Sequence, residues 1–248
     1  DVLPRLAPNS IDAYRTWLTV HVLPYFASMD ARHLRSEDLQ RFVAQKLGEQ
    51  LAVGYVKQLV GQVKTILRQG IEWGVLRPGS ADFRVRYPRV QADEIDPFTP
   101  DEINKLLDAA KTKWRPMFKL GIWSGMRQGE LLAARWRHLD TVKQQYYVCE
   151  NITRRMAFGD VKGRNAAPVE LSPFVMAALE EHRSHVAQWQ LGAAEWEDND
   201  LIFPNSNTGK PWTHSYVRKV FADTCERAGV LYRPPHNMRH TCASLLRH

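Results

Sequence analysis

Apolar residues recur at helical spacing through the first ninety residues of the chain. Ser10 can cap a first helix that ends near Pro24, and Ser36 can cap a second helix. A third helix is predicted from about residue 53 to residue 73, because its apolar residues fall on one face. This apolar stripe consists of Val56, Leu59, Val60, Val63, Ile66, Leu67 and Ile71.

The helical pattern stops at residues 89–98, a charged, proline-containing stretch that we interpret as a linker. It separates a helical first domain, residues 1–88, from a second domain, residues 99–248. The second domain opens on a capping box, because Thr99 precedes a proline at the first helical position and Glu102 follows three residues after the cap.

The second domain mixes helical and extended segments. Helices are predicted over residues 116–123, 128–136, 172–190 and 215–228, with a last one from His236. Short strands are predicted over residues 142–150, 151–158 and 167–171, with a turn at residues 159–165 joining the last two. The predicted fold class is therefore mainly α with a small β-sheet (α+β), in two domains.

The chain of 248 residues has a net charge of +7. Residues 1–90 hold 13 basic and 8 acidic residues, a net of +5, whereas residues 91–248 hold 21 and 19, a net of +2. Such an excess suits a polyanion such as DNA, and equally a solubilising surface. Lys57, Lys64 and Arg68 lie between the apolar positions of the third helix and are candidate DNA contacts, with a solvated helix face as the alternative.

The composition argues against a membrane protein and against a metal-dependent protein. No apolar run approaches the roughly 20 residues that a membrane-spanning helix needs, so we expect no membrane partner. The three cysteines show no CxxC spacing, which indicates reduced thiols in a cytoplasmic protein. A metal site at His236 and His240 would lack an accompanying carboxylate or cysteine, so we expect none.

Two distant segments each place an arginine near a predicted helix start. In SGMRQGELL, Glu130 follows Arg127 by three residues, so it lies on the same helical face and can orient the guanidinium group. In HNMRHTCAS, His236 and Arg239 also share one face, and His240 is expected to support that helix. Guanidinium groups match two phosphate oxygens, and helix-start amides add positive potential. Surface ion pairs are the plainer alternative for each arginine.

Lys162 lies between the two arginine segments, in the turn at residues 159–165. A lysine on a hairpin can reach a leaving oxygen and protonate it. Arg164 is a poor acid because its pKa is too high. A solvated hairpin lysine is the alternative interpretation.

The segments SGMRQGELLAARW and HNMRHTCAS resemble the two arginine boxes of the tyrosine recombinases, the phage integrase family. The resemblance covers nearly the whole chain and implies a SAM-like core-binding domain followed by a catalytic domain. The catalytic residues that it implies are Arg127, Lys162, His236 and Arg239, with Glu130 and His240 in support.

Membership of this family implies a site-specific recombinase that cuts and rejoins duplex DNA through a 3′-phosphotyrosine, for integration or excision of a mobile element such as a prophage. It implies no cofactor, because the phosphotyrosyl bond conserves the energy of the broken bond. The partners that it implies are double-stranded DNA at attachment sites, further copies in a homotetramer, and an accessory DNA-bending or excision protein, in the bacterial cytoplasm at the nucleoid.

The tyrosine nucleophile of this family follows the second arginine box, and only nine residues follow Arg239 here. The tyrosines at 146, 147, 216 and 232 precede that box and match nothing in the pattern. We therefore expect the nucleophile to lie outside this sequence, and DNA binding without cleavage by these residues alone. Whether an arm-binding domain precedes Asp1 stays open. The alternatives are a degenerate integrase that only binds DNA and a type IB topoisomerase, which uses similar chemistry.

Overall fold

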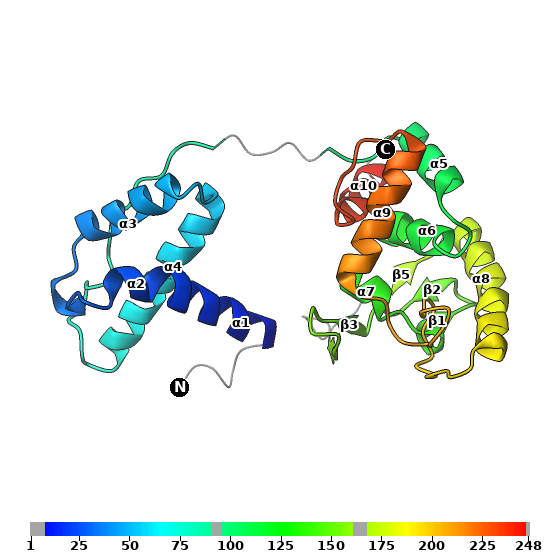
Figure 1. Cartoon of the computed structure of the whole chain (residues 1–248), viewed down its shortest axis with the longest axis horizontal. Helices are drawn as coiled ribbons and strands as arrows, with labels where there is room; N and C mark the ends of the chain where they lie inside the picture. The colour runs from blue at the N-terminus through cyan, green and yellow to red at the C-terminus, as the bar shows by residue number, and fades with distance from the viewer. Residues whose placement is uncertain (1–7, 91–95, 161–167, 247–248) are drawn as a thin grey trace. The chain divides into compact units, whose positions relative to one another are not determined.

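The computed structural model describes residues 8–90, 96–160 and 168–246. The chain divides into two compact units, Asp1–Asp93 and Glu94–His248 (Figure 1). Each unit has its own hydrophobic core. Helices dominate both units, and small antiparallel sheets occur in the second. The predicted α+β fold class is confirmed.

The first unit is helical throughout its described elements. These are α1 (Pro8–Thr16), a π-helical stretch (Trp17–Val22), α2 (Leu23–Phe26), a 3-10 turn (Ala31–His33), α3 (Ser36–Gly48) and α4 (Val53–Glu72). The first predicted helix therefore continues past Pro24. The N–H of Leu23 reaches the carbonyl of Leu18, a wide π-type turn placed directly before the proline, whose ring would clash in a regular helix.

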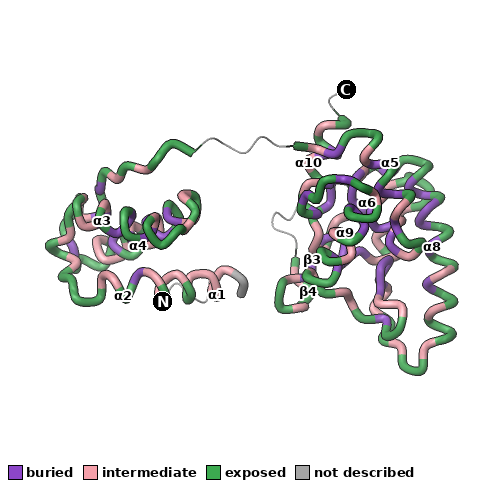
Figure 2. Tube along the Cα trace, turned by 45° about the horizontal axis from the view of Figure 1, so that its top comes forward, coloured by how far each residue is buried: buried purple, intermediate pink, exposed green. Residues whose placement is uncertain are grey.

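The core of the first unit forms mainly between α3 and α4 (Figure 2). The predicted stripe of α4 is buried at Val56, Leu59, Val60, Val63 and Leu67. Ile66 is an exception, because its side chain is 48% exposed. Ser36 is the first residue of α3 and not its cap, and its hydroxyl accepts a hydrogen bond from the N–H of Arg84 at 3.2 Å.

The second unit is built around α6 (Arg115–Ser124), which buries residues on most of its circumference. It contacts α5 (Pro100–Ala109), α7 (Gln128–Leu132), α8 (Pro173–Gly192) and α10 (Asn237–Leu245), while α9 (His214–Ala228) packs on α5. The capping box of α5 is confirmed, because Thr99 Oγ1 accepts from the N–H of Glu102 at 3.3 Å and Glu102 Oε2 accepts from the N–H of Thr99 at 2.8 Å.

Five short strands form two antiparallel sheets among the described residues of the second unit. One sheet has the order β1 (Leu139–Asp140), β2 (Gln145–Tyr146), β5 (Val169–Glu170), and the other pairs β3 (Glu150–Ile152) with β4 (Phe158–Asp160). In register, Tyr146 faces both Leu139 and Val169, and Asn151 faces Gly159. The predicted hairpin between the last two strands is wrong. The chain turns back earlier, through a turn with Met156 at φ 61°, so that β4 pairs with β3 and β5 pairs with β2.

Candidate active site

Arg127 lies in the short connection between the end of α6 and the start of α7. Gly125 ends α6 in a left-handed conformation, φ 63°, which glycine adopts without steric cost. The N–H of Arg127 donates to Glu130 Oε2 and its Nη1 donates to Glu130 Oε1, both at 2.8 Å. The Glu130 side chain is 6% exposed, whereas that of Arg127 is 57% exposed. A buried carboxylate thus holds the guanidinium group at the surface.

Arg239 reaches the same connection from α10. Its Nη1 donates to the carbonyl of Gly125 at 2.6 Å, a short charge-assisted hydrogen bond. A Cβ added at Gly125 would lie 3.2 Å from Cys242 Sγ, so the glycine lets α10 pack directly against this turn. The structure therefore brings the two arginine segments together at Gly125.

His236 directly precedes α10 and is exposed. The ring of His240, one turn along the helix, lies 4.8 Å from it at 90°. The pKa of His236 lies below its ordinary value of 6.5, because partial burial and then the positive charges of His240, Arg239 and Arg127 disfavour its protonated form. The two arginines and the imidazole therefore share one electropositive surface, on which a neutral imidazole can exchange a proton with a bound anion.

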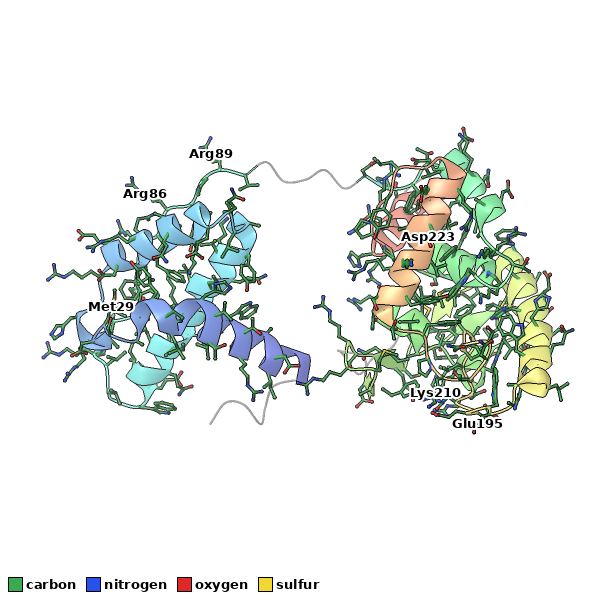
Figure 3. All side chains as sticks on the ribbon, in the orientation of Figure 1. Met29, Arg86, Arg89, Glu195, Lys210 and Asp223 are labelled. Atoms are coloured by element: carbon green, nitrogen blue, oxygen red, sulfur yellow. The ribbon has the colours of Figure 1, made fainter. Side chains whose placement is uncertain are left out.

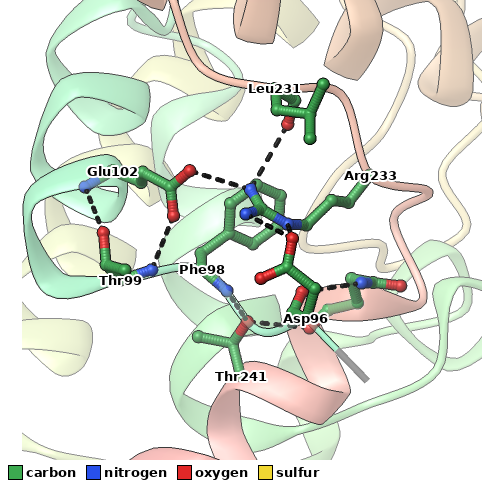
Figure 4. Close-up of polar contacts among 8 residues, drawn as sticks. Asp96, Phe98, Thr99, Glu102, Leu231, Arg233 and Thr241 are labelled. Atoms are coloured by element: carbon green, nitrogen blue, oxygen red, sulfur yellow. Dashed lines mark hydrogen bonds and ion pairs between the residues drawn. The ribbon is translucent and has the colours of Figure 1, made fainter. Parts of the chain in front are cut away.

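A network around Arg233 fixes the segment that enters α10 (Figure 4). The Arg233 guanidinium donates to Asp96 Oδ2 at 2.8 Å through Nε and to Glu102 Oε1 at 2.9 Å through Nη1, and it lies 4.8 Å from the ring of Phe98. Partial burial raises the pKa of Glu102, but hydrogen bonds from Thr99 and Arg233 outweigh it and leave that pKa below 4.5. Only 10% of the Arg233 side chain is exposed.

Thr241 and Asn237 attach α10 to the same stretch of chain. Thr241 Oγ1 accepts from the N–H of Phe98 at 3.0 Å, and Asn237 Nδ2 donates to the carbonyl of Asp96 at 3.2 Å. These bonds, together with Arg233, position the helix that carries Arg239 and directly follows His236. Sequence reasoning missed this role of Arg233, for which an arginine directly before Pro234 and Pro235 is the only local signal.

Beneath Arg127, α7 packs tightly on β3. A Cβ added at Gly129 would lie 2.8 Å from the carbonyl oxygen of Ile152, so only glycine permits this approach. His214 Nε2 lies 2.8 Å from the same oxygen, and Gln128 Nε2 donates to the carbonyl of His214 at 3.0 Å. The start of α9 therefore links the arginine-bearing connection to the β3–β4 hairpin. Nothing in the sequence pattern points to His214 in this role.

The remaining candidate residues are Lys162 and the three basic residues of α4. Lys162 lies outside the described residues. Lys64 Nζ donates to the carbonyl of Phe83 at 2.9 Å, which is a structural contact within the first unit. Lys57 Nζ lies 5.3 Å from the ring centre of Tyr87, and Arg68 is exposed.

Groups of metal-ligating side chains are absent from the described part of the chain. The helices found there are also too short or too polar to cross a bilayer.

A family model described as "Phage integrase family" matches residues 97–248, which is more than half of the chain. The chain belongs to the phage integrase family. The match contains both arginine segments and every element that packs against them.

Two curated relatives come from bacteria. A "Tyrosine recombinase XerC-like" protein of Caldanaerobacter subterraneus subsp. tengcongensis is 26% identical over 243 residues, which cover 86% of this chain and 60% of the relative. The "Prophage integrase IntR" of Escherichia coli (strain K12) is 29% identical over 166 residues, which cover 61% of this chain and 40% of the relative. The chain therefore spans less than two thirds of the length of either relative.

Solved integrase structures share the fold. The Tn1549 transposon integrase in complex with a circular intermediate DNA has a TM-score of 0.83 at 16% identity, covering 99% of this chain and 84% of that chain. A lambda integrase tetramer bound to a Holliday junction has a TM-score of 0.72 at 14% identity, covering 99% and 69%. At these identities the likeness establishes the fold.

Proposed function

We propose that this chain supplies the core-binding domain (residues 1–88), a linker (residues 89–98) and the catalytic domain of a site-specific DNA recombinase. The observation that carries the proposal is the attachment of Arg127 and Arg239 to the connection at Gly125, with His236 beside them. Fixed guanidinium groups and an imidazole are the donors that stabilise negative charge as it grows on a phosphodiester.

In the proposed reaction a tyrosine oxygen attacks the scissile phosphorus and the bond from phosphorus to the 5′ oxygen breaks. The products are a 3′-phosphotyrosyl bond and a free 5′-hydroxyl. Arg127 and Arg239 stabilise the non-bridging oxygens, and His236 hydrogen-bonds the phosphate and assists proton transfer. Lys162 protonates the leaving 5′ oxygen. A 5′-hydroxyl of a second strand then reverses these steps, so that this chemistry requires neither a nucleotide nor a metal.

The proposed partners follow from the same chemistry. Duplex DNA at attachment sites is the substrate, and the related integrase structures are complexes with a circular intermediate DNA and with a Holliday junction. A homotetramer on DNA is proposed for this protein, in line with the tetramer named for lambda integrase. We also propose an accessory DNA-bending or excision protein as a partner, and a location at the bacterial nucleoid. The prophage named for one relative supports this part of the proposal.

The test is strand cleavage by the intact gene product on a nicked attachment-site substrate that traps the covalent intermediate. Arg239→Ala removes one of the donors to the phosphate, so we expect the cleavage rate to fall by about 10²–10³ while the Kd for duplex DNA changes only a few-fold. Arg137→Ala, at an exposed ion pair with Glu150 3.3 Å away, is the matched control and should cleave normally.

Other outcomes would identify the alternatives. An equal loss of binding and cleavage in Arg239→Ala would contradict a catalytic role for this arginine. Relaxation of supercoiled DNA without recombinant joints would indicate a type IB topoisomerase. Binding without any covalent intermediate in the intact gene product would indicate a degenerate integrase.

A further inference from the structure

A second basic surface lies in a cavity of about 210 Å³ between the loop that follows α5 and helix α9. None of the described residues of the candidate active site lines it. The charged side chains of the cavity are Lys111, Lys113, Lys219, Arg227 and Asp223. Four of the five are basic, so the cavity carries a local excess of three positive charges.

Asp223 offsets one of these basic charges, and the described residues that line the cavity leave the other three without a carboxylate. Across the described ranges, neither Lys111 nor Lys219 forms an ion pair, and Asp223 has no basic partner. Like charges gathered in a concave surface repel each other and raise the local potential, because the protein walls screen them less than water does. An anion that enters the cavity would relieve this repulsion.

Arg227 is held in place for such an anion. Its Nε and Nη2 donate to the carbonyl of Ala109 at 3.3 and 3.2 Å, and Nη2 also donates to Thr224 Oγ1 at 3.1 Å. The carbonyl of Ala109 belongs to the last turn of α5, whose free carbonyl groups favour a cation. Nη1 has no hydrogen-bond partner within the described residues, so one donor edge of a fixed guanidinium group is available.

An aromatic wall gives the cavity a rigid side. Trp114 is buried, and Tyr216 is 42% exposed and stacks on Trp212 with a centroid distance of 4.8 Å and an angle of 10°. Lys113 Nζ lies 5.8 Å from the ring centre of Trp114 and 5.4 Å from that of Trp212. Cation–π contacts at these distances limit the freedom of the Lys113 ammonium group, so its charge stays beside the two rings before a ligand arrives.

We propose that this cavity binds a phosphate group through Lys111, Lys219 and Arg227. A phosphate presents several anionic oxygens at once, which suits one guanidinium edge flanked by ammonium groups. The group comes either from a DNA backbone position away from the scissile bond or from a free nucleotide. The first source rests on the proposed recombinase function, and the second does not.

The test compares Lys111→Gln/Lys219→Gln with the matched control Lys143→Gln/Lys210→Gln. The control lysines are 64% and 63% exposed and lie opposite Asp140 and Glu197, and Figure 3 places Lys210 in a loop away from Asp223 on α9. One arm measures the Kd for a 30-base-pair duplex of unrelated sequence by fluorescence anisotropy between about 50 and 200 mM salt. The other arm titrates dAMP and inorganic phosphate and follows amide and indole NMR shifts.

If a DNA phosphate occupies the cavity, the pocket variant loses about one to two units of the slope of log K against log salt, at about 0.9 per phosphate contact, and the control loses less. If a free nucleotide occupies it, dAMP shifts the Trp114 indole signal in the wild type and fails to do so in the pocket variant, while the DNA slope is unchanged. If neither differs from the control, the inference is wrong. Absence of DNA binding by the wild-type chain would instead count against the proposed recombinase.

Discussion

His236 is the residue of the candidate site whose protonation can be measured directly by NMR titration. Its pKa is held below 6.5 by partial burial and by neighbouring positive charges, Arg127 among them, so less than half of the folded molecules are protonated there at pH 6.5. We expect Arg127→Gln to raise this pKa, because it removes one of those charges. Imidazole NMR signals followed from pH 4.5 to pH 8 measure both values, with assignment by His236→Gln.

Arg183→Gln serves as the control for that titration, because Arg183 stacks over the ring of Trp136 at 5.1 Å and is not among the groups that act on His236. A wild-type pKa above 6.5 for His236, or an equal change in that pKa in both arginine variants, would show that Arg127 does not act on the charge of His236. The proposed proton transfer would then lose its electrostatic basis.

Gly129 allows a separate prediction at the same scale. Gly129→Ala would place a methyl group 2.8 Å from the carbonyl oxygen of Ile152, and a backbone atom cannot swing aside as a side chain can. We expect a loss of about 1–3 kcal/mol of unfolding free energy in urea, as for overpacked sites. Gly61→Ala is the control, because the position is helical with no heavy atom within 4 Å, and a gain of about 0.5–1 kcal/mol is expected there. Equal effects at the two glycines would contradict the tight packing of α7 on β3.

At the scale of elements, Arg233 ties the start of α5 to the entry of α10. Arg233→Met would leave Glu102 without its ionic partner in a site where 22% of that side chain is exposed. We expect a loss of about 2–4 kcal/mol of unfolding free energy, and faster hydrogen exchange in α10 than in α8. The double variant with Glu102→Gln should lose less than the single variant, because it leaves only Asp96, whose side chain is 60% exposed, without its ionic partner. Arg137→Met, at a more exposed ion pair, should cost less than about 1 kcal/mol.

The helices of this fold could be predicted from the sequence, whereas the pairing of its strands could not. Helices with a clear apolar face, such as α4 and α5, and the cap at Thr99 were predictable because local spacing decides them. The strand pairing was not, because strands of two or three residues carry almost no periodicity and their partners are set by tertiary packing. Likewise, motifs could nominate Arg127 and Arg239, but only the fold could show that Gly125 joins them.

At the scale of the whole molecule, DNA binding should be dominated by charge. Residues 1–90 carry a net charge of +5, but the candidate contacts of α4 are not equivalent there. Lys57 and Arg68 are exposed, whereas the ammonium group of Lys64 is engaged with the carbonyl of Phe83. We therefore expect Lys57→Gln/Arg68→Gln to reduce the slope of log K against log salt by up to about two units on duplex DNA.

Lys64→Gln is the informative comparison for this prediction. It removes the same charge, but its lost hydrogen bond lies inside the first unit, so unfolding free energy should fall by about 1 kcal/mol while the salt slope changes by less than one unit. Anisotropy titrations and urea unfolding on the same preparations separate the two effects. An unchanged slope in Lys57→Gln/Arg68→Gln would remove α4 from the DNA-binding surface, and the basic excess of the first unit would then have to act through other residues.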